Sequence, residues 1–179
     1  MSHGRFVTFG SLAAAAVLAF AIFGWGGTPA MSQGRLRADV FLVQKMIPGK
    51  MTEKGLIGFA RGSNAKILRE SSEPELLKRT WAGSMVVAFN QTPNDLEYHV
   101  LFYDVSEGTR RFVDDLSIFI SDRSRKTFVQ KFKLDRPRFR PNRRMELVVT
   151  VKRAEVGARK FDMAGEEVKH DGVVNITDE

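Results

Sequence analysis

The sequence contains no cysteine, and it has only three histidines, two tryptophans and two tyrosines among its 179 residues. The absence of cysteine excludes disulfides, thiolate metal sites, thiol nucleophiles and lipid attachment through an N-terminal cysteine. The folded state must therefore be stabilised by packing. An oxidising compartment does not require cysteine, so its absence is neutral about export.

The scarcity of histidine limits the catalytic chemistry that the chain can carry. His3 lies close to the N-terminus and His170 lies in a polar tail, which leaves His99 alone in the central part of the chain. No serine with an acidic partner forms a recognisable nucleophile motif around His99. We therefore expect a protein that is not an enzyme.

Groups that could bind a metal are also few. Asp104, Glu107, Asp114 and Asp115 lie on either side of Gly108, and oxygen ligands of this kind could hold calcium. Their spacing matches no known calcium loop, and aspartate near glycine is typical of a turn between strands. The sequence thus predicts no metal site and no cofactor.

Residues 6–25 contain no charged side chain and are almost entirely apolar or small. Residues 12–25 match the length of a signal-peptide core, and a Gly-Gly-Thr-Pro stretch precedes Ala30 as a cleavage position. The alternative is an uncleaved anchor, because about 20 apolar residues span a bilayer. We assign 1–30 to a signal peptide or signal anchor and 31–37 to a linker, and expect a periplasmic or secreted protein, or one anchored in the membrane.

The charges that flank this segment argue partly against export. Only Arg5 precedes it, whereas Arg35, Arg37, Lys45 and Lys50 follow it. The positive-inside rule would keep this downstream side in the cytoplasm. Because the downstream charges begin well past the end of the apolar run, we retain the exported interpretation.

From Trp81 onward, apolar residues recur with period two and turn residues separate the runs, which is typical of an antiparallel sheet protein. In the segment 127–134, one face is predicted to be apolar and the other to carry Lys131 and Lys133. In the segment 112–120, one apolar face is predicted to contain Phe112, Leu116, Ile118 and Ile120.

The remaining segments give weaker indications. Residues 38–47 favour a strand over a short helix, and 55–60 is a short apolar run with glycines. Ser71 or Ser72, followed by Glu-Pro-Glu, predicts a short helix that ends by about Arg79. Residues 154–156 are predicted to join the last two strands as a hairpin.

Together these patterns predict an all-β domain over residues 38–165. We expect an immunoglobulin-like antiparallel β-sandwich of about seven strands, preceded by the N-terminal apolar targeting or anchor helix. Trp81 or Tyr98 would fill its central aromatic position. Residues 166–179 are predicted to form a polar C-terminal tail.

Charge gives the strongest local indication of function. The net charge is +7, and a basic segment lies between Arg123 and Arg144. Its prolines stiffen an extended loop from which arginines could grip phosphates or carboxylates, although such a loop could equally be solvated and protect sheet edges from aggregation. The candidate residues for binding an anion or an acidic partner are Lys131, Lys133, Arg136, Arg138, Arg140, Arg143 and Arg144.

These observations favour a non-enzymatic, exported or envelope-tethered adaptor or scaffold that binds an envelope protein through main-chain pairing at a sheet edge. The alternative is a basic surface between Arg123 and Arg144 that binds anionic lipid or a cell-wall polymer. Nucleic acid is not expected as a partner, because the basic segment contains one aromatic residue, Phe139, and lacks the repeated stacking residues of single-strand binders. The oligomeric state is not predicted.

Overall fold

The computed structural model describes residues 34–167. The predicted signal segment at 1–30 and the tail beyond residue 167 lie outside this range. Within it, no helix is both long enough and apolar enough to cross a membrane.

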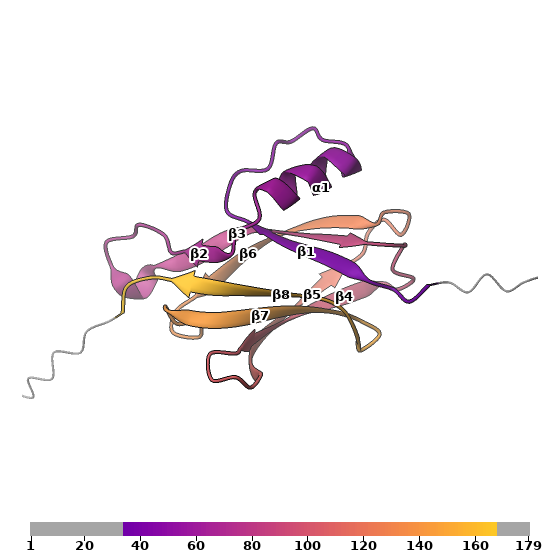
Figure 1. Ribbon diagram of the computed structural model, residues 1–179. Coiled ribbons are helices and arrows are strands. Elements are labelled where there is room, and N and C mark those ends of the chain that lie inside the picture. The colour runs from indigo at the N-terminus through magenta and orange to yellow at the C-terminus, as the bar shows by residue number, and fades with distance from the viewer. Residues whose placement is uncertain (1–33, 168–179) are drawn as a thin grey trace, which may run out of the picture. The chain divides into compact units, whose positions relative to one another are not determined.

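Two β-sheets face one another in the described part of the chain (Figure 1). One sheet has three strands in the order β1-β3-β6, and the other has five in the order β2-β8-β7-β4-β5. All neighbouring pairs are antiparallel except β2 with β8, which is parallel. The strands are β1 (Ala38–Val43), β2 (Ile67–Arg69), β3 (Thr80–Phe89), β4 (Glu97–Asp104), β5 (Arg111–Phe119), β6 (Thr127–Asp135), β7 (Arg143–Val151) and β8 (Ala154–Ala164). The predicted β-sandwich is confirmed.

The core lies between the two sheets because alternate residues of each strand point inward. Trp81 of β3 and Tyr98 of β4, the two residues proposed for the central aromatic position, are both fully buried. Trp81 also donates a hydrogen bond from Nε1 to the backbone oxygen of Ala164, at 2.9 Å. A buried indole N–H without a hydrogen bond would destabilise the folded state, and this bond satisfies it. Because Ala164 is the last residue of β8, the same bond links the end of β8 to the core.

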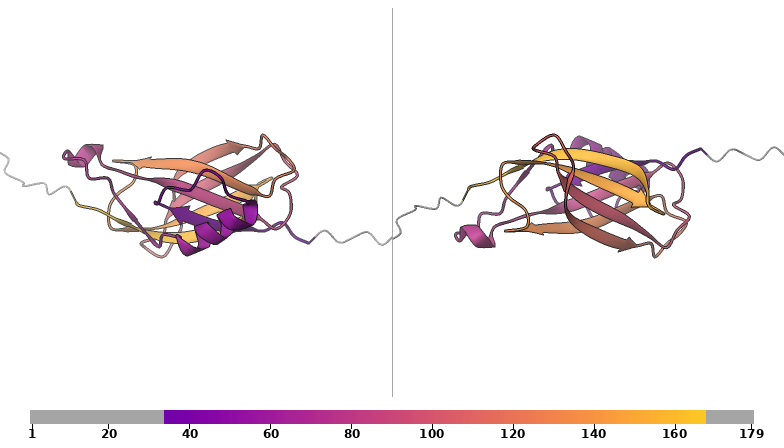
Figure 2. Two further views of the ribbon diagram at one scale, coloured as in Figure 1. Left: turned by 90° about the horizontal axis from the view of Figure 1, so that it is seen from above. Right: turned by 90° about the horizontal axis from the view of Figure 1, so that it is seen from below.

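Helix α1 (Glu53–Gly62) packs on the outer face of the three-stranded sheet (Figure 2). It begins at Thr52, whose hydroxyl accepts a hydrogen bond from the Gly55 N–H at 3.2 Å. Its buried Ala60 contacts a cluster that includes Phe41 and Val86. The sequence indicated only a short apolar run here, because two glycines lower the helix propensity; the cap and the apolar contact outweigh that cost.

Two local predictions are corrected by the structure. The helix expected to end near Arg79 is a single 3-10 turn, η1 (Leu76–Lys78). The turn between the last two strands lies at Lys152 and Arg153 rather than at 154–156, and both residues have positive φ, 50° and 64°. Two consecutive residues with positive φ give the turn the twist that a tight hairpin requires, so β7 ends at Val151 and β8 already begins at Ala154.

A β-bulge corrects the predicted face of Phe112. The register between β4 and β5 shifts between Phe102 and Tyr103, so that Phe112 pairs with Tyr103 and their ring centroids lie 6.0 Å apart. Phe112 is therefore 56% exposed instead of sharing the inner face with Ile118 and Ile120. Simple alternation along the strand cannot anticipate one inserted residue.

Candidate functional site

The predicted basic residues do not form one surface. They come from β6, the loop after it and the start of β7. Among the residues that the structure describes, Lys131 and Arg140 are exposed and have no carboxylate partner, whereas the other five candidates contact acidic side chains.

Arg136 is directed into the protein, and its side chain is only 5% exposed. Its Nη2 donates to Glu70 Oε2 at 2.5 Å and to the backbone oxygen of Glu166 at 2.7 Å. Its guanidinium also lies over the Trp81 ring, 5.2 Å from the centroid. Arg136 therefore does not project toward an external anion; it ties the loop after β6 to the segment after β2 and to the end of β8.

Glu70 is the acceptor at the centre of this contact. It also accepts hydrogen bonds from Arg79 Nη1 at 3.1 Å and from the Glu166 N–H at 2.8 Å. Burial raises the pKa of the Glu70 carboxyl, but the bonds from Glu166, Arg136 and Arg79 outweigh it and hold the pKa below its ordinary value. Glu70 is thus a charged structural group at neutral pH.

Three further arginines contact carboxylates on the five-stranded sheet or the loop beside it. Arg138 Nη1 lies 2.8 Å from an Asp114 oxygen, and Arg144 Nε lies 3.1 Å from Asp162. Arg143 lies more loosely between two carboxylates, with its closest distance 3.7 Å to Glu107. The positive charges of these three arginines are therefore partly balanced by carboxylates of the protein itself.

The two candidate lysines lie on the exposed face of β6. Lys131 and Lys133 alternate with the buried Phe132 and Leu134, as the sequence predicts. Lys133 Nζ contacts Asp135 at 3.2 Å. Lys131 borders a groove between β6 and the loop before α1.

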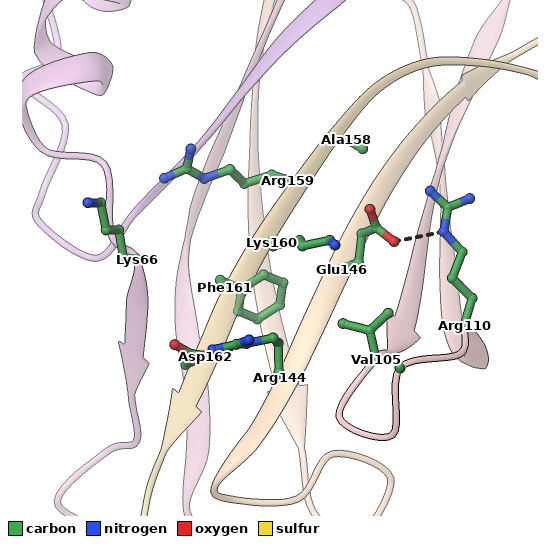
Figure 3. A pocket seen from close by; sticks show the side chains of 11 residues that line it. Lys66, Val105, Arg110, Arg144, Glu146, Ala158, Arg159, Lys160, Phe161 and Asp162 are labelled. Atoms are coloured by element: carbon green, nitrogen blue, oxygen red, sulfur yellow. Dashed lines mark hydrogen bonds and ion pairs between the residues drawn. The ribbon is translucent and has the colours of Figure 1, made fainter.

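A second basic surface lies along β7 and β8 of the five-stranded sheet, where Arg159 and Lys160 point to opposite sides of β8 (Figure 3). It is a groove of about 830 Å³ whose charged lining consists of Lys66, Arg110, Arg144, Glu146, Arg159, Lys160 and Asp162. Arg110 is held by Glu146 at 2.7 Å and by Glu155 at 2.6 Å, and these two carboxylates raise its pKa. Lys66, Arg159 and Lys160 have no carboxylate partner among residues 34–167.

Strand β5 is an edge strand, because it pairs only with β4 within the described chain. The Ile120 N–H donates to the Leu96 oxygen at 2.7 Å, which fixes the alternation of hydrogen-bonded pairs along the ladder. In an antiparallel ladder the intervening residues direct both backbone groups away from the neighbour. The backbone groups of Asp115, Ser117 and Phe119 therefore point toward the open edge.

The side chains beside this edge include two large exposed rings. Phe119 is 68% exposed and Phe112 is 56% exposed. The bulge places Phe112 on the same outer face as Phe119, with Asp115 and Ser117 between them. No lysine or proline occurs in β5, although these residues commonly protect an edge from pairing. The edge combines free backbone groups with apolar side chains.

The acidic residues considered for calcium do not converge. Asp104 and Asp114 are engaged by Arg111 at 3.2 Å and by Arg138, respectively. Residues 34–167 contain no group of three or more His, Asp or Glu side chains placed to hold a metal ion. His99 has Glu97 as its neighbour, 3.4 Å from Nε2, and its side chain is 39% exposed.

Comparisons with known proteins bear on the fold alone. No protein-family model matches the chain, and no curated protein matches it in sequence. Among solved structures, a crystal structure of an immunoglobulin-like protein from Pseudomonas aeruginosa is similar, with 12% identity and a TM-score of 0.40. The match covers 74% of this chain and 98% of that one.

Sequence reasoning missed the groove in Figure 3 and the exposed pair of rings on β5. Lys66, Arg110 and Arg159 are far apart in the sequence, so no local run of charge indicates their proximity. Phe112 and Phe119 are seven positions apart, and in a regular strand such an odd spacing places two residues on opposite faces of the sheet. Only the bulge brings both rings to the same face.

Proposed function

We propose that this domain is a non-enzymatic protein-interaction module that receives an extended segment of an envelope protein along the open edge of β5. The observation that carries this proposal is the unpaired edge of a nine-residue strand with Phe112 and Phe119 exposed beside it. An added strand would hydrogen-bond to the outward backbone groups of β5 and cover both rings.

Export or membrane tethering is part of the same proposal. It rests on the apolar composition of residues 6–25 and would place the domain in the envelope. The alternative, an anionic lipid or wall polymer on the segment between Arg123 and Arg144, is less favoured. Arg136, Arg138 and Arg144 of that segment already contact carboxylates.

Ser117→Pro tests edge pairing because the Ser117 N–H points away from β4. The substitution should leave the β4 ladder in place, remove one outward donor and place a ring where the added strand would lie. We expect affinity for the partner to fall at least about tenfold, equivalent to about 1.4 kcal/mol. Recovery from envelope extract followed by titration of the recovered protein measures the change.

Two variants serve as controls. Ser117→Ala removes the hydroxyl that donates to Glu97 at 2.8 Å but retains the backbone donor. Lys131→Pro places proline at an outward position of another edge strand, β6. Both should recover the partner as the unaltered chain does. Equal recovery by Ser117→Pro, with thermal unfolding showing a folded domain, would contradict pairing at β5.

A further inference from the structure

Residues 44–51, here named the lysine-methionine loop, connect β1 to α1 and present an unusually exposed apolar side chain. Met46 is 94% exposed, and Met51 is 38% exposed. The base of the loop is fixed, because Ile47 packs with Leu56 of α1 against the cluster that contains Val43. Met46 thus projects from an anchored loop.

The surface beside the loop is also partly apolar. A groove of about 760 Å³ separates the loop from β6, and its lining includes Met46, Met51, Leu56 and Val129. Val129 is 46% exposed even though it lies on a strand of the sandwich. The apolar area therefore extends from the loop onto the outer face of the three-stranded sheet.

Lysines surround this apolar area. Lys45 and Lys50 lie in the loop, Lys54 follows in α1 and Lys131 lies across the groove. All four are exposed, and within residues 34–167 none has a carboxylate within ion-pair distance. Glu53 is the acidic residue nearest to the loop in the sequence. The surface therefore carries a net positive charge around an apolar centre.

We propose that the lysine-methionine loop docks onto an anionic lipid bilayer, with Met46 inserted among the acyl chains and the lysines at the head-group phosphates. A peptide-binding groove recesses its apolar side chains into the walls, whereas Met46 projects and so suits a deformable apolar phase. Lysine stems can lie along the apolar boundary while their ammonium groups reach the phosphates. The proposal is independent of β5, which belongs to the other sheet.

The lack of cysteine permits a direct test in the full chain. Met46→Cys is labelled with an environment-sensitive fluorophore and mixed with vesicles of phosphatidylcholine and phosphatidylglycerol. Leu77→Cys is the matched control, because Leu77 is also highly exposed, at 64%, but lies in η1. Attachment through residues 6–25 would hold both variants on the vesicles equally, so the difference between positions 46 and 77 reports docking of the domain.

We expect a blue shift at position 46 that a lipid-chain quencher reverses, and no shift at position 77. High salt should abolish the shift, and adding Lys45→Gln or Lys50→Gln should weaken docking about fivefold each. The proposal is overturned if position 46 does not shift, if position 77 shifts equally, or if pure phosphatidylcholine vesicles give the same shift. A shift produced by soluble polyglutamate without vesicles would also overturn it and assign the surface to an acidic polypeptide.

Discussion

Glu70 and Arg136 lie 66 positions apart in the sequence, and their contact is the least exposed ion pair in the described part of the chain. Arg136 belongs to a segment whose composition suggested an external basic loop. Removing one partner of such a pair leaves the other charge enclosed without compensation. The pair is therefore expected to contribute to stability rather than to ligand binding.

Replacement of Glu70 by glutamine should test this role. We expect Glu70→Gln to lower the free energy of unfolding by about 2–3 kcal/mol at neutral pH, because hydrogen bonds to a charged carboxylate are lost. Denaturant titration measures the loss. Glu75→Gln is the control: its ion pair with Lys78 is exposed, and we expect a change below about 1 kcal/mol.

The same substitution should change the acid sensitivity of the protein. The pKa of Glu70 is lowered in the folded state, so its contribution to stability is complete above the ordinary value of 4.5 and is lost as the pH falls through the folded value. The stability difference between the unaltered chain and Glu70→Gln should therefore shrink well below pH 4.5. An undiminished difference there would contradict the proposed role of the carboxylate charge.

At the residue scale, the sequence shows where the basic side chains occur but does not predict which of them remain free to bind a ligand. Arg136 and Arg140 occur in the same arginine-proline stretch, yet one is enclosed by Glu70 and Trp81 and the other is exposed. The difference depends on carboxylates that are distant in the sequence. Local charge density contains no information about such partners.

At the scale of elements, β1 approaches β8 closely enough to require glycine at position 157. A Cβ built on Gly157 would lie 2.3 Å from the backbone oxygen of Ala38. Backbone atoms cannot move aside as a flexible side chain can. The two sheets therefore approach each other at backbone distance on this side of the sandwich.

Gly157→Ala should consequently destabilise the domain by about 1–3 kcal/mol, as overpacking typically does. Gly58→Ala is the matched control, because position 58 lies in α1 with nothing within 4 Å of the added atom. That control should raise stability by up to about 1 kcal/mol through helix propensity. Thermal unfolding of both variants checks the signs, and a neutral Gly157→Ala would show that the sheets can separate there.

The elements that sequence analysis predicted best were those with a sustained period. In β6 apolar and polar residues alternate regularly, and in the structure Phe132 and Leu134 are buried while Lys131 and Lys133 are exposed, as predicted. Helix α1 and the bulge in β5 were missed for different physical reasons. The helix depends on packing against Phe41 and Val86, and the bulge depends on register with β4.

At the scale of the whole molecule, the two proposed interactions use opposite sheets. The open edge of β5 belongs to the five-stranded sheet, whereas the lysine-methionine loop and α1 lie on the three-stranded sheet (Figure 1). A bilayer contact through the loop would leave β5 accessible to a protein partner. Binding of one should therefore not compete with binding of the other.

The mature N-terminus tests the proposed location. We expect the native protein to begin at Met31, because the residues before it resemble a signal peptide with cleavage after Ala30. Intact-mass measurement distinguishes this chain from an uncleaved one. A mass that includes residues 6–25 would instead favour the membrane anchor.

The bulge in β5 also bears on which changes of length the strand could tolerate. Deletion of Val113 would leave Phe112 opposite Tyr103, but it would remove a side chain that packs against the core. Insertions in an exposed loop rarely have such an effect, since a loop can absorb them. The number of residues in β5 is therefore as restricted as their chemical type, even though the strand lies at the edge of its sheet.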